Sequence, residues 1–201
     1  MPAGPALPGP ALAGRTLVLK TIAAGEVWRR MYESRHPNPL GWGPALNRFS
    51  DPTGRTFGVV YLGSSAKVAF VETLLRDAAD GRGADCVLQL AAIEARSLAS
   101  IRVKDRLRLV DLTGDSGLRM GVPSDVAGAS DHTLSRLWSA AFHGHKDAPD
   151  GVYYPSRLNE ERCIALYDRA LGNVAATATP RLIDCDAELA AILDDLEIAL
   201  V

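Results

Sequence analysis

The chain has 201 residues, of which 47% are hydrophobic, and its formal net charge at pH 7 is −2. A chain of this length and composition can bury a sizeable core, so we expect one folded domain and exclude a disordered chain. The slightly acidic balance argues against direct binding to DNA or RNA, which depends on concentrated positive charge. It is still compatible with a local basic pocket.

The cysteines and the N-terminal segment indicate the compartment. Cys86, Cys163 and Cys185 are widely separated and form no C-x-x-C pair, so we expect buried thiols in a reducing compartment. Residues 1–14 are rich in proline, alanine and glycine and lack the basic start of a signal peptide, which predicts a flexible tail before a folded domain at 15–201. No apolar stretch is long enough to cross a bilayer. We therefore predict a cytoplasmic protein without membrane contact.

Short strands and helices are predicted without a regular repeat. In chain order we expect a short element at Leu17–Ile22, a strand at Val27–Tyr32, an irregular connection at 35–56, a strand at Phe57–Leu62, a helix from Ala66 to about Ala79, strands at Cys86–Ile93 and Leu107–Leu112, a helix from Ser130 or Asp131 to Phe142, strands at Gly151–Tyr154, Cys163–Tyr167 and Arg181–Ile183, and a helix at Ala187–Leu200. Long irregular connections in compact domains are often binding elements. The order favours an α+β fold over a doubly wound sheet.

Glu72 is the polar residue in the least expected place. It lies on the predicted helix with Val68 and Leu75 at spacings that share one apolar face. A carboxylate on such a face is costly unless it is paired or used in function. A buried ion pair with Arg76 and a functional role are both open from the periodicity.

Arginines and a tyrosine nearby suggest a binding site for an anion with an aromatic ring. Arg29, Arg30 and Arg48 are candidates for clamping phosphates, because guanidinium groups bind phosphates bidentately. Tyr61 ends an apolar strand, where its ring could stack on a flat ligand. Each of these residues has a plain alternative, because surface arginines and packed strand tyrosines are common.

Other patterns are weaker. Pro155 breaks a strand and places Ser156 and Arg157 in a loop, but no histidine is positioned by sequence to activate the serine, so no hydrolase triad is inferred. His143 and His145 lack a third ligand, and we predict no metal. The chain contains no G-x-G-x-x-G and no P-loop.

Read together, these segments resemble the RES domain, a family named for its arginine, glutamate and serine. The matching segments are Trp28-Arg29, Asn47-Arg48-Phe49-Ser50, Gly58-Val59-Val60-Tyr61-Leu62, Ala69-Phe70-Val71-Glu72-Thr73, Val110-Asp111-Leu112-Thr113, Leu118-Arg119-Met120-Gly121 and Gly151-Val152-Tyr153-Tyr154-Pro155-Ser156-Arg157. The resemblance covers about residues 15–185, and the order and spacing of the motifs carry it.

RES proteins are toxins of RES-Xre toxin–antitoxin modules. The resemblance implies one domain similar to ADP-ribosyltransferases, with central mixed or antiparallel sheets flanked by helices. It implies NAD+ as a substrate, an Xre-type antitoxin that blocks the active site, and no metal. The catalytic residues it implies are Glu72, Arg29 and Ser156, and the implied NAD+-binding residues are Arg48, Tyr61, Tyr32, Arg30 and Arg157. Motif position leaves Arg29 and Arg30 both open for the first arginine, and we prefer Arg29.

The residues fit the implied chemistry. Breaking the nicotinamide–ribose bond leaves an oxocarbenium-like sugar, which a carboxylate such as Glu72 can stabilise. The acceptor of the ADP-ribose is open among water, phosphate and a protein side chain. A toxin that degrades NAD+ is therefore the leading hypothesis. A protein ADP-ribosyltransferase and a non-catalytic nucleotide- or partner-binding domain are the alternatives.

Overall fold

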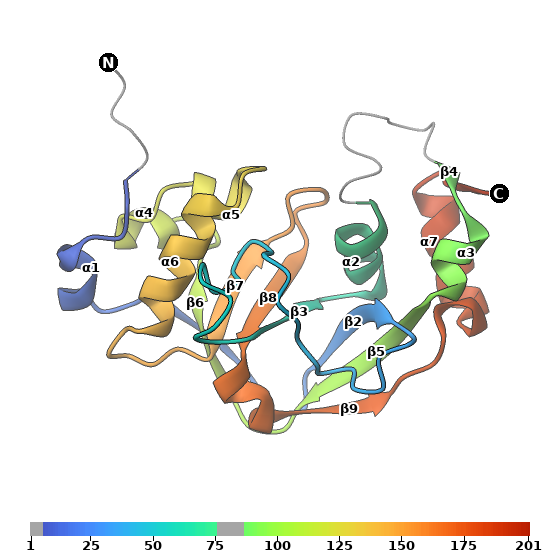
Figure 1. Ribbon diagram of the computed structural model, residues 1–201, viewed down its shortest axis with the longest axis horizontal. Coiled ribbons are helices and arrows are strands. Elements are labelled where there is room, and N and C mark those ends of the chain that lie inside the picture. Colours follow the sequence, from blue (N-terminus) through green and yellow to red (C-terminus); the bar gives the residue numbers. More distant parts are fainter. Residues whose placement is uncertain (1–5, 76–86) are drawn as a thin grey trace, which may run out of the picture.

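A computed structural model describes residues 6–75 and 87–201, and one mixed eight-stranded sheet runs through that part of the chain (Figure 1). The strand order is β1-β6-β7-β8-β3-β2-β5-β9. The strands are β1 (Leu19–Ile22), β2 (Val27–Glu33), β3 (Val59–Gly63), β5 (Arg96–Val103), β6 (Leu107–Asp111), β7 (Gly151–Pro155), β8 (Arg162–Tyr167) and β9 (Val174–Ala178). The predicted α+β class is confirmed.

All neighbouring strands of this sheet pair antiparallel except β6 and β7, which are parallel. A parallel pair needs a long crossover, because the chain must return to the starting edge of the sheet. Residues 112–150 provide it and contain three of the helices. The β7–β8 pair is a hairpin, so its turn places Ser156 and Arg157 at one end of the sheet.

The sheet is curled, and its inner face forms one of three cores. Ile22 and Leu107, at one end of the strand order, share this core with Ile101 and Val174 at the other end. The backbone N–H of Gly25 also donates to the carbonyl of Val103 at 2.8 Å. The two ends of the sheet therefore approach each other around an apolar interior.

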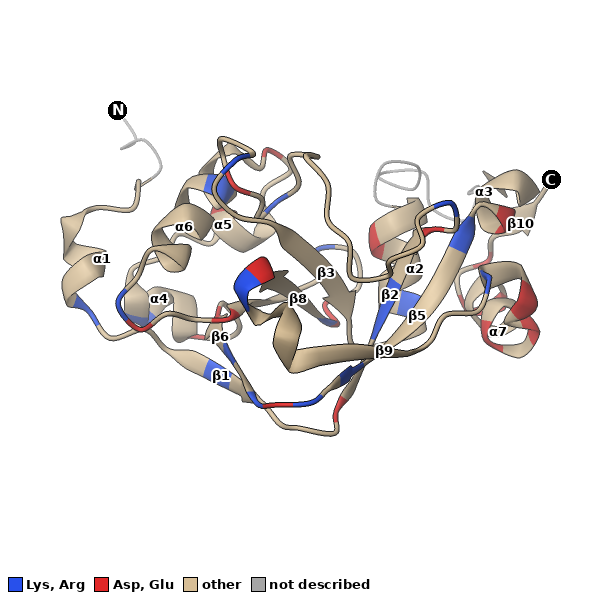
Figure 2. Ribbon diagram, turned by 60° about the horizontal axis from the view of Figure 1, so that its bottom comes forward, with Lys and Arg blue, Asp and Glu red and all other residues tan. Residues whose placement is uncertain are grey.

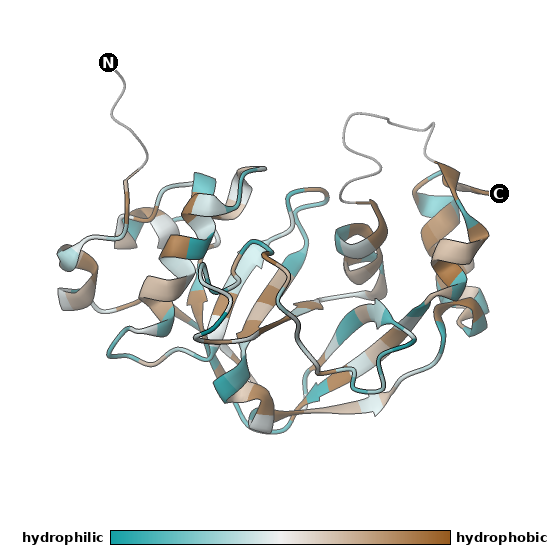
Figure 3. Ribbon diagram, viewed as in Figure 1, coloured by the Kyte–Doolittle hydropathy of each residue, from teal (hydrophilic) through white to brown (hydrophobic). Residues whose placement is uncertain are grey.

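Two groups of helices cover the outer face of the sheet and bury the other two cores (Figures 1 and 3). The first group, over β6, β7 and β8, is α1 (Pro10–Gly14), α4 (Ser116–Met120), α5 (Asp125–Gly128) and α6 (Thr133–His143). The second group, over β2 and β5, is α2 (Ala66–Phe70), the π-helix η1 (Val71–Leu75), α3 (Leu90–Glu94), the 3₁₀ helix η4 (Leu182–Asp184) and α7 (Asp186–Asp195). A further 3₁₀ helix, η3 (Asp168–Asn173), joins β8 to β9, and β4 (Val87–Leu88) pairs with β10 (Ala199–Leu200).

Some predicted elements are wrong. The strand expected at Cys86–Ile93 is reduced to β4, and Leu90–Glu94 is helical because its leucine and alanine residues favour helix. Cys86 lies outside the described residues. The strand expected at Arg181–Ile183 is a 3₁₀ turn with a single bridge from Arg181 to β5.

The ends of the chain also differ from expectation. The helix predicted at Ala187–Leu200 ends at Asp195, and the chain then extends into β10. The proline-rich segment expected to lack regular structure forms α1, with Pro10 in the first helical position, where its missing N–H costs nothing. Leu12 of α1 is buried. Within the described ranges, no helix is long and apolar enough to span a membrane.

Candidate active site

A pocket of about 260 Å³ opens on the outer face of the sheet, between the two helix groups. Four adjacent strands form its floor through Tyr154 (β7), Cys163 (β8), Tyr61 (β3) and Arg29 (β2). The walls come from α2 and η1, from the 35–56 connection and from the segment before α6, through Val68, Ala69, Glu72, Thr73, Asn47, Arg48 and His132. Five of the predicted site residues therefore line one pocket: Arg29, Arg30, Arg48, Tyr61 and Glu72.

Ser156 and Glu72 meet although 84 residues separate them. The hydroxyl of Ser156 donates to Oε1 of Glu72 at 2.6 Å. Ser156 is only 2% exposed, and its hydroxyl oxygen accepts from the backbone N–H of Leu158 at 3.2 Å. The serine is thus fixed by its own turn and holds one carboxylate oxygen of a residue that lines the pocket.

The helix that carries Glu72 changes type just before it. Ser65 caps α2 by accepting from the backbone N–H of Val68, but after Phe70 the chain widens into the π-helix η1. Single π turns are frequent at functional sites. Val71 and Leu75 are buried in the core while Glu72 is half-buried at the pocket. The predicted ion pair with Arg76 lies outside the described residues.

Strand alternation separates Arg29 from Arg30. Trp28 belongs to the inner core and Met31 to the core under α2, so successive residues of β2 face opposite sides of the sheet. Arg29 thus faces the outer side, where the pocket lies. Arg30 alternates to the inner side and donates to the carbonyl of Gly41 at 2.7 Å, although it also contributes to the pocket wall. This favours Arg29 as the first site arginine, and its role stays a prediction.

Burial affects the electrostatics of these cations. Burial lowers the pKa of Arg30 to about 10, which leaves it charged at neutral pH. Burial also lowers the pKa of Arg48, which is 9% exposed and donates to the carbonyl of Ala129 at 2.7 Å. Two buried positive groups with little hydration attract an anionic ligand strongly.

The 35–56 connection has no helix or strand and is nevertheless fixed beside the pocket. The hydroxyl of Tyr61 accepts from the backbone N–H of Phe49 at 2.9 Å. On the other side of Phe49, its carbonyl accepts from the hydroxyl of Ser139 at 2.7 Å. These bonds hold Arg48 in place, and they give Tyr61 a structural task in addition to lining the pocket.

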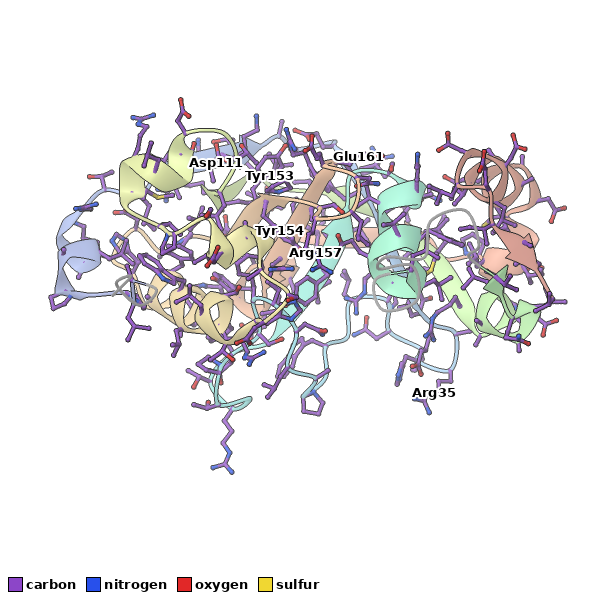
Figure 4. The ribbon with its side chains drawn as sticks, turned by 90° about the horizontal axis from the view of Figure 1, so that it is seen from above. Arg35, Asp111, Tyr153, Tyr154, Arg157 and Glu161 are labelled. Atoms are coloured by element: carbon purple, nitrogen blue, oxygen red, sulfur yellow. The ribbon has the colours of Figure 1, made fainter. Side chains whose placement is uncertain are left out.

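Tyr32 and Arg157 lie outside this pocket wall. Tyr32 packs against the inner core, as strand alternation requires. Arg157 is exposed and lines a second, neighbouring pocket together with Ser156, yet it is close enough to lower the pKa of Arg48. Arg157 lies in the turn after β7 and is labelled in Figure 4.

The pocket contains residues that sequence reasoning missed. Tyr154 is 4% exposed, and burial raises its pKa well above the usual range, with Glu72 among its charged neighbours. His132 and Asn47 line the walls and Cys163 the floor. Tyr154 and Asn47 carried a signal, since they lie in the matching segments that contain Ser156 and Arg48. Among the described residues no group of three or more His, Cys, Asp or Glu side chains could hold a metal ion.

The fold and the comparison with known families together show to which protein family this chain belongs. The described part of the chain is an α+β domain in which a curled mixed sheet is flanked by helices. The family model described as the RES domain matches residues 20–188, so the chain belongs to the RES domain family.

Two known proteins are similar to this chain. It is 39% identical over 127 residues to "Probable toxin y4kH" of Sinorhizobium fredii, an alignment that covers 63% of this chain and all of that relative. The crystal structure of the MbcT-MbcA toxin–antitoxin complex of M. tuberculosis matches with a TM-score of 0.60 and 21% identity, over 85% of this chain and 92% of that chain. The second likeness shows the fold alone.

Proposed function

We propose that this protein is the toxin of a toxin–antitoxin pair and that it cleaves the nicotinamide–ribose bond of NAD+. Family membership supports the proposal, as do the names of its relatives, a probable toxin and a toxin–antitoxin complex. The observation that carries it is the pocket itself, in which a carboxylate fixed by a serine hydroxyl lies among arginines and tyrosines.

Glu72 has the charge that the reaction requires. When the bond breaks, its electron pair leaves with nicotinamide, and C1′ of the ribose becomes positively charged. A carboxylate held in place by Ser156 stabilises that charge without reorganising. Water or phosphate then forms the new bond to C1′, so hydrolysis gives ADP-ribose, nicotinamide and one proton. The hydrogen bond from Ser156 leaves the second oxygen of Glu72 for the sugar.

The remaining residues suit the rest of the substrate. Arg29 and Arg48 would hold the pyrophosphate, and Tyr61 and Tyr154 would contact the nicotinamide ring. The pocket volume of about 260 Å³ lies below the roughly 300–1,000 Å³ of sites that enclose whole drug-sized ligands. We therefore place the nicotinamide-riboside end in the pocket and the adenosine outside it, toward the neighbouring pocket that Arg157 lines.

An antitoxin of the Xre type is the proposed partner. A slot that holds pyrophosphate between arginines also accepts a carboxylate, so an acidic side chain or a chain terminus can block it. If the purified pair turned over NAD+ as fast as the toxin alone, this mode of inhibition would be wrong.

The purified protein incubated with labelled NAD+ tests the function. Reactions with and without phosphate and cell lysate separate the acceptors. Free nicotinamide without labelled protein supports degradation, whereas label on a protein band supports ADP-ribosyl transfer. Intact NAD+ in every reaction would contradict both enzymatic functions and leave a binding domain.

Replacing Glu72 tests its assigned role. Glu72→Gln keeps the size of the side chain but removes the charge that stabilises the sugar, and we expect turnover to fall by about two orders of magnitude or more. Glu94→Gln makes the same change at an exposed site on α3 and is the control. Nicotinamide release measures the effect, and growth arrest on expression should be relieved by the first variant alone.

A further inference from the structure

The C-terminal helix α7 contacts Arg29 from outside the pocket. Oε2 of Glu188 accepts from Nη2 of Arg29 at 2.7 Å. Glu188 is 43% exposed and does not line the pocket, so this ion pair is formed on the solvent side of the guanidinium group. Figure 2 shows acidic residues on α7 and basic residues on β2.

The guanidinium group of Arg29 is held at two of its three nitrogens. Nη1 donates to the hydroxyl of Ser100 on β5 at 3.1 Å, and Nη2 donates to Glu188. Nε is buried and has no acceptor among the described residues. Buried N–H donors are almost always paired. Nε of Arg29, which has no acceptor among the described residues, is thus part of a side chain that lines the pocket.

Helix α7 is itself fixed relative to the rest of the site. Leu189 and Ile192 are buried in the same core as Phe70 and Leu75, which flank Glu72. An ion pair between Lys67 and Asp195 also joins α2 to α7. The distance between the carboxylate of Glu72 and the guanidinium of Arg29 is therefore set partly through α7.

The Arg29–Glu188 ion pair is expected to order the side chain of Arg29 more than to stabilise the folded protein. Ion pairs with an exposed partner contribute little to folding, because water screens them. An arginine side chain, however, loses considerable rotamer entropy when a ligand immobilises it. A partner that orders the side chain before binding removes that cost from the binding step.

We propose that Glu188 is a positioning residue for Arg29. Together with Ser100 it holds the guanidinium group in one position at the pocket wall, where the charge of that group can meet the anionic part of the substrate. The inference rests on the proposed function, because it names the substrate that Arg29 receives.

Kinetics of nicotinamide release and calorimetric binding of ADP-ribose test the inference. For Glu188→Ala we expect KM for NAD+ and Kd for ADP-ribose to rise roughly three- to tenfold with kcat within about twofold, because Arg29 stays but is less ordered. Glu188→Gln keeps an acceptor oxygen and should recover part of the loss. Asp194→Asn, at an exposed carboxylate of the same helix, is the control and should behave as the wild type.

A double-mutant cycle distinguishes positioning from a general structural role. In an Arg29→Ala background, Glu188→Ala should cause no further rise in Kd, since the residue it positions is gone. If the double variant showed an additive rise in Kd, or if Glu188→Ala alone had the KM of the wild type, the inference would be overturned. The proposed cleavage of NAD+ would not be affected by either result. A wild-type protein that neither turns over NAD+ nor binds ADP-ribose would overturn both the inference and the proposed function.

Discussion

At the scale of single residues, the bond between Ser156 and Glu72 joins two parts of the chain that are far apart in the sequence. The serine lies in the turn after β7, and the glutamate lies in the π turn after α2. The short distance of 2.6 Å is typical of a hydroxyl that donates to a charged carboxylate. Such a bond fixes the direction of the carboxylate as well as its position.

Ser156→Ala removes this bond. Because hydrogen bonds to charged groups contribute about 1.5–3 kcal/mol, we expect nicotinamide release to slow by roughly ten- to a hundredfold. Ser156→Thr keeps the hydroxyl and should retain more activity than the alanine variant. Ser64→Ala, at an exposed serine before α2, is the control. Equal rates for Ser156→Ala and the wild type would remove Ser156 from the proposed site.

The sequence predicted much of the site because each motif carries its own chemistry. It could not decide between Arg29 and Arg30, since alternation along β2 assigns a face only when the cores on both sides are known. Tyr32 was expected near the ligand because the sequence alone did not show which face of β2 it occupies. In the structure its side chain packs against the inner core of the sheet. His132 falls inside the helix predicted from Ser130 or Asp131, whereas α6 begins at Thr133, and nothing in the sequence indicates that this histidine lines the pocket.

At the scale of elements, the close approach of β3 and α2 positions Glu72. A Cβ atom on Gly63 would lie 2.8 Å from Cγ1 of Val68 and 2.9 Å from the backbone nitrogen of Ala69. The second atom belongs to the helix backbone and cannot turn away. Only glycine allows α2 to start so close to the strand.

Gly63→Ala should therefore push α2 away from the sheet. We expect the free energy of unfolding to fall by about 1–3 kcal/mol, and turnover at saturating NAD+ to fall by on the order of tenfold or more because Glu72 moves. Chemical denaturation and nicotinamide release measure the two effects. Gly172→Ala, where a Cβ meets nothing within 4 Å, is the control. A fully active Gly63→Ala would show that the position of α2 is not critical.

The turn that begins at Asp51 gives the domain a pH dependence. Burial alone would raise the pKa of this carboxyl, but hydrogen bonds from Thr53, Arg55 and Thr56 hold it well below its usual range. A lowered folded-state pKa stabilises the protein above the unfolded value of roughly 3.9, and that contribution is lost as the pH falls.

Asp51→Ala should lower the free energy of unfolding by about 1–3 kcal/mol at pH 7. The difference from the wild type should shrink as the pH falls below roughly 4, because the carboxyl of the unfolded chain then takes up a proton that the folded one does not. Urea unfolding at several pH values measures this. A difference that stayed constant down to pH 2 would mean that the charge of Asp51 does not matter.

Two strands were not predicted from the sequence, and each lacks the alternating pattern of a half-exposed strand. β5 was not predicted, because residues on both of its faces are buried and its pattern lacks the alternation of a half-exposed strand. Val174–Ala178 was missed because it is a short edge strand of mostly alanine, which favours strands weakly. In contrast, β3, β7 and β8 had apolar runs bounded by turns, and these strands and β2 appear close to where they were expected.

At the scale of the whole molecule, the N-terminal segment belongs to the fold although the family match begins at residue 20. The carbonyl of Ala6 accepts from Nε1 of Trp138, and the carbonyl of Leu12 lies 3.1 Å from Nε2 of the buried His145. The side chain of Leu12 packs in the core under α6. These contacts attach residues 6–12 to the helices over β6, β7 and β8.

Two leucines of this segment make a matched test. Leu12 is 6% exposed and Leu7 is 63% exposed. Leu12→Ala should lower the free energy of unfolding by about 2–5 kcal/mol, whereas Leu7→Ala should leave it nearly unchanged. KM and kcat should not change in either variant, because the segment does not line the pocket. Equal stability of the two variants would mean that α1 contributes nothing to the fold.

The place of α7 near the end of the chain has a consequence for synthesis. The last residue that lines the pocket is Cys163, whereas α7 begins at Asp186. A ribosome releases the pocket residues first, at about 5–20 residues per second, and the helix that holds Arg29 follows later. We expect a nascent chain to bind its substrate poorly until α7 has emerged, because Arg29 lacks its partner Glu188 before then.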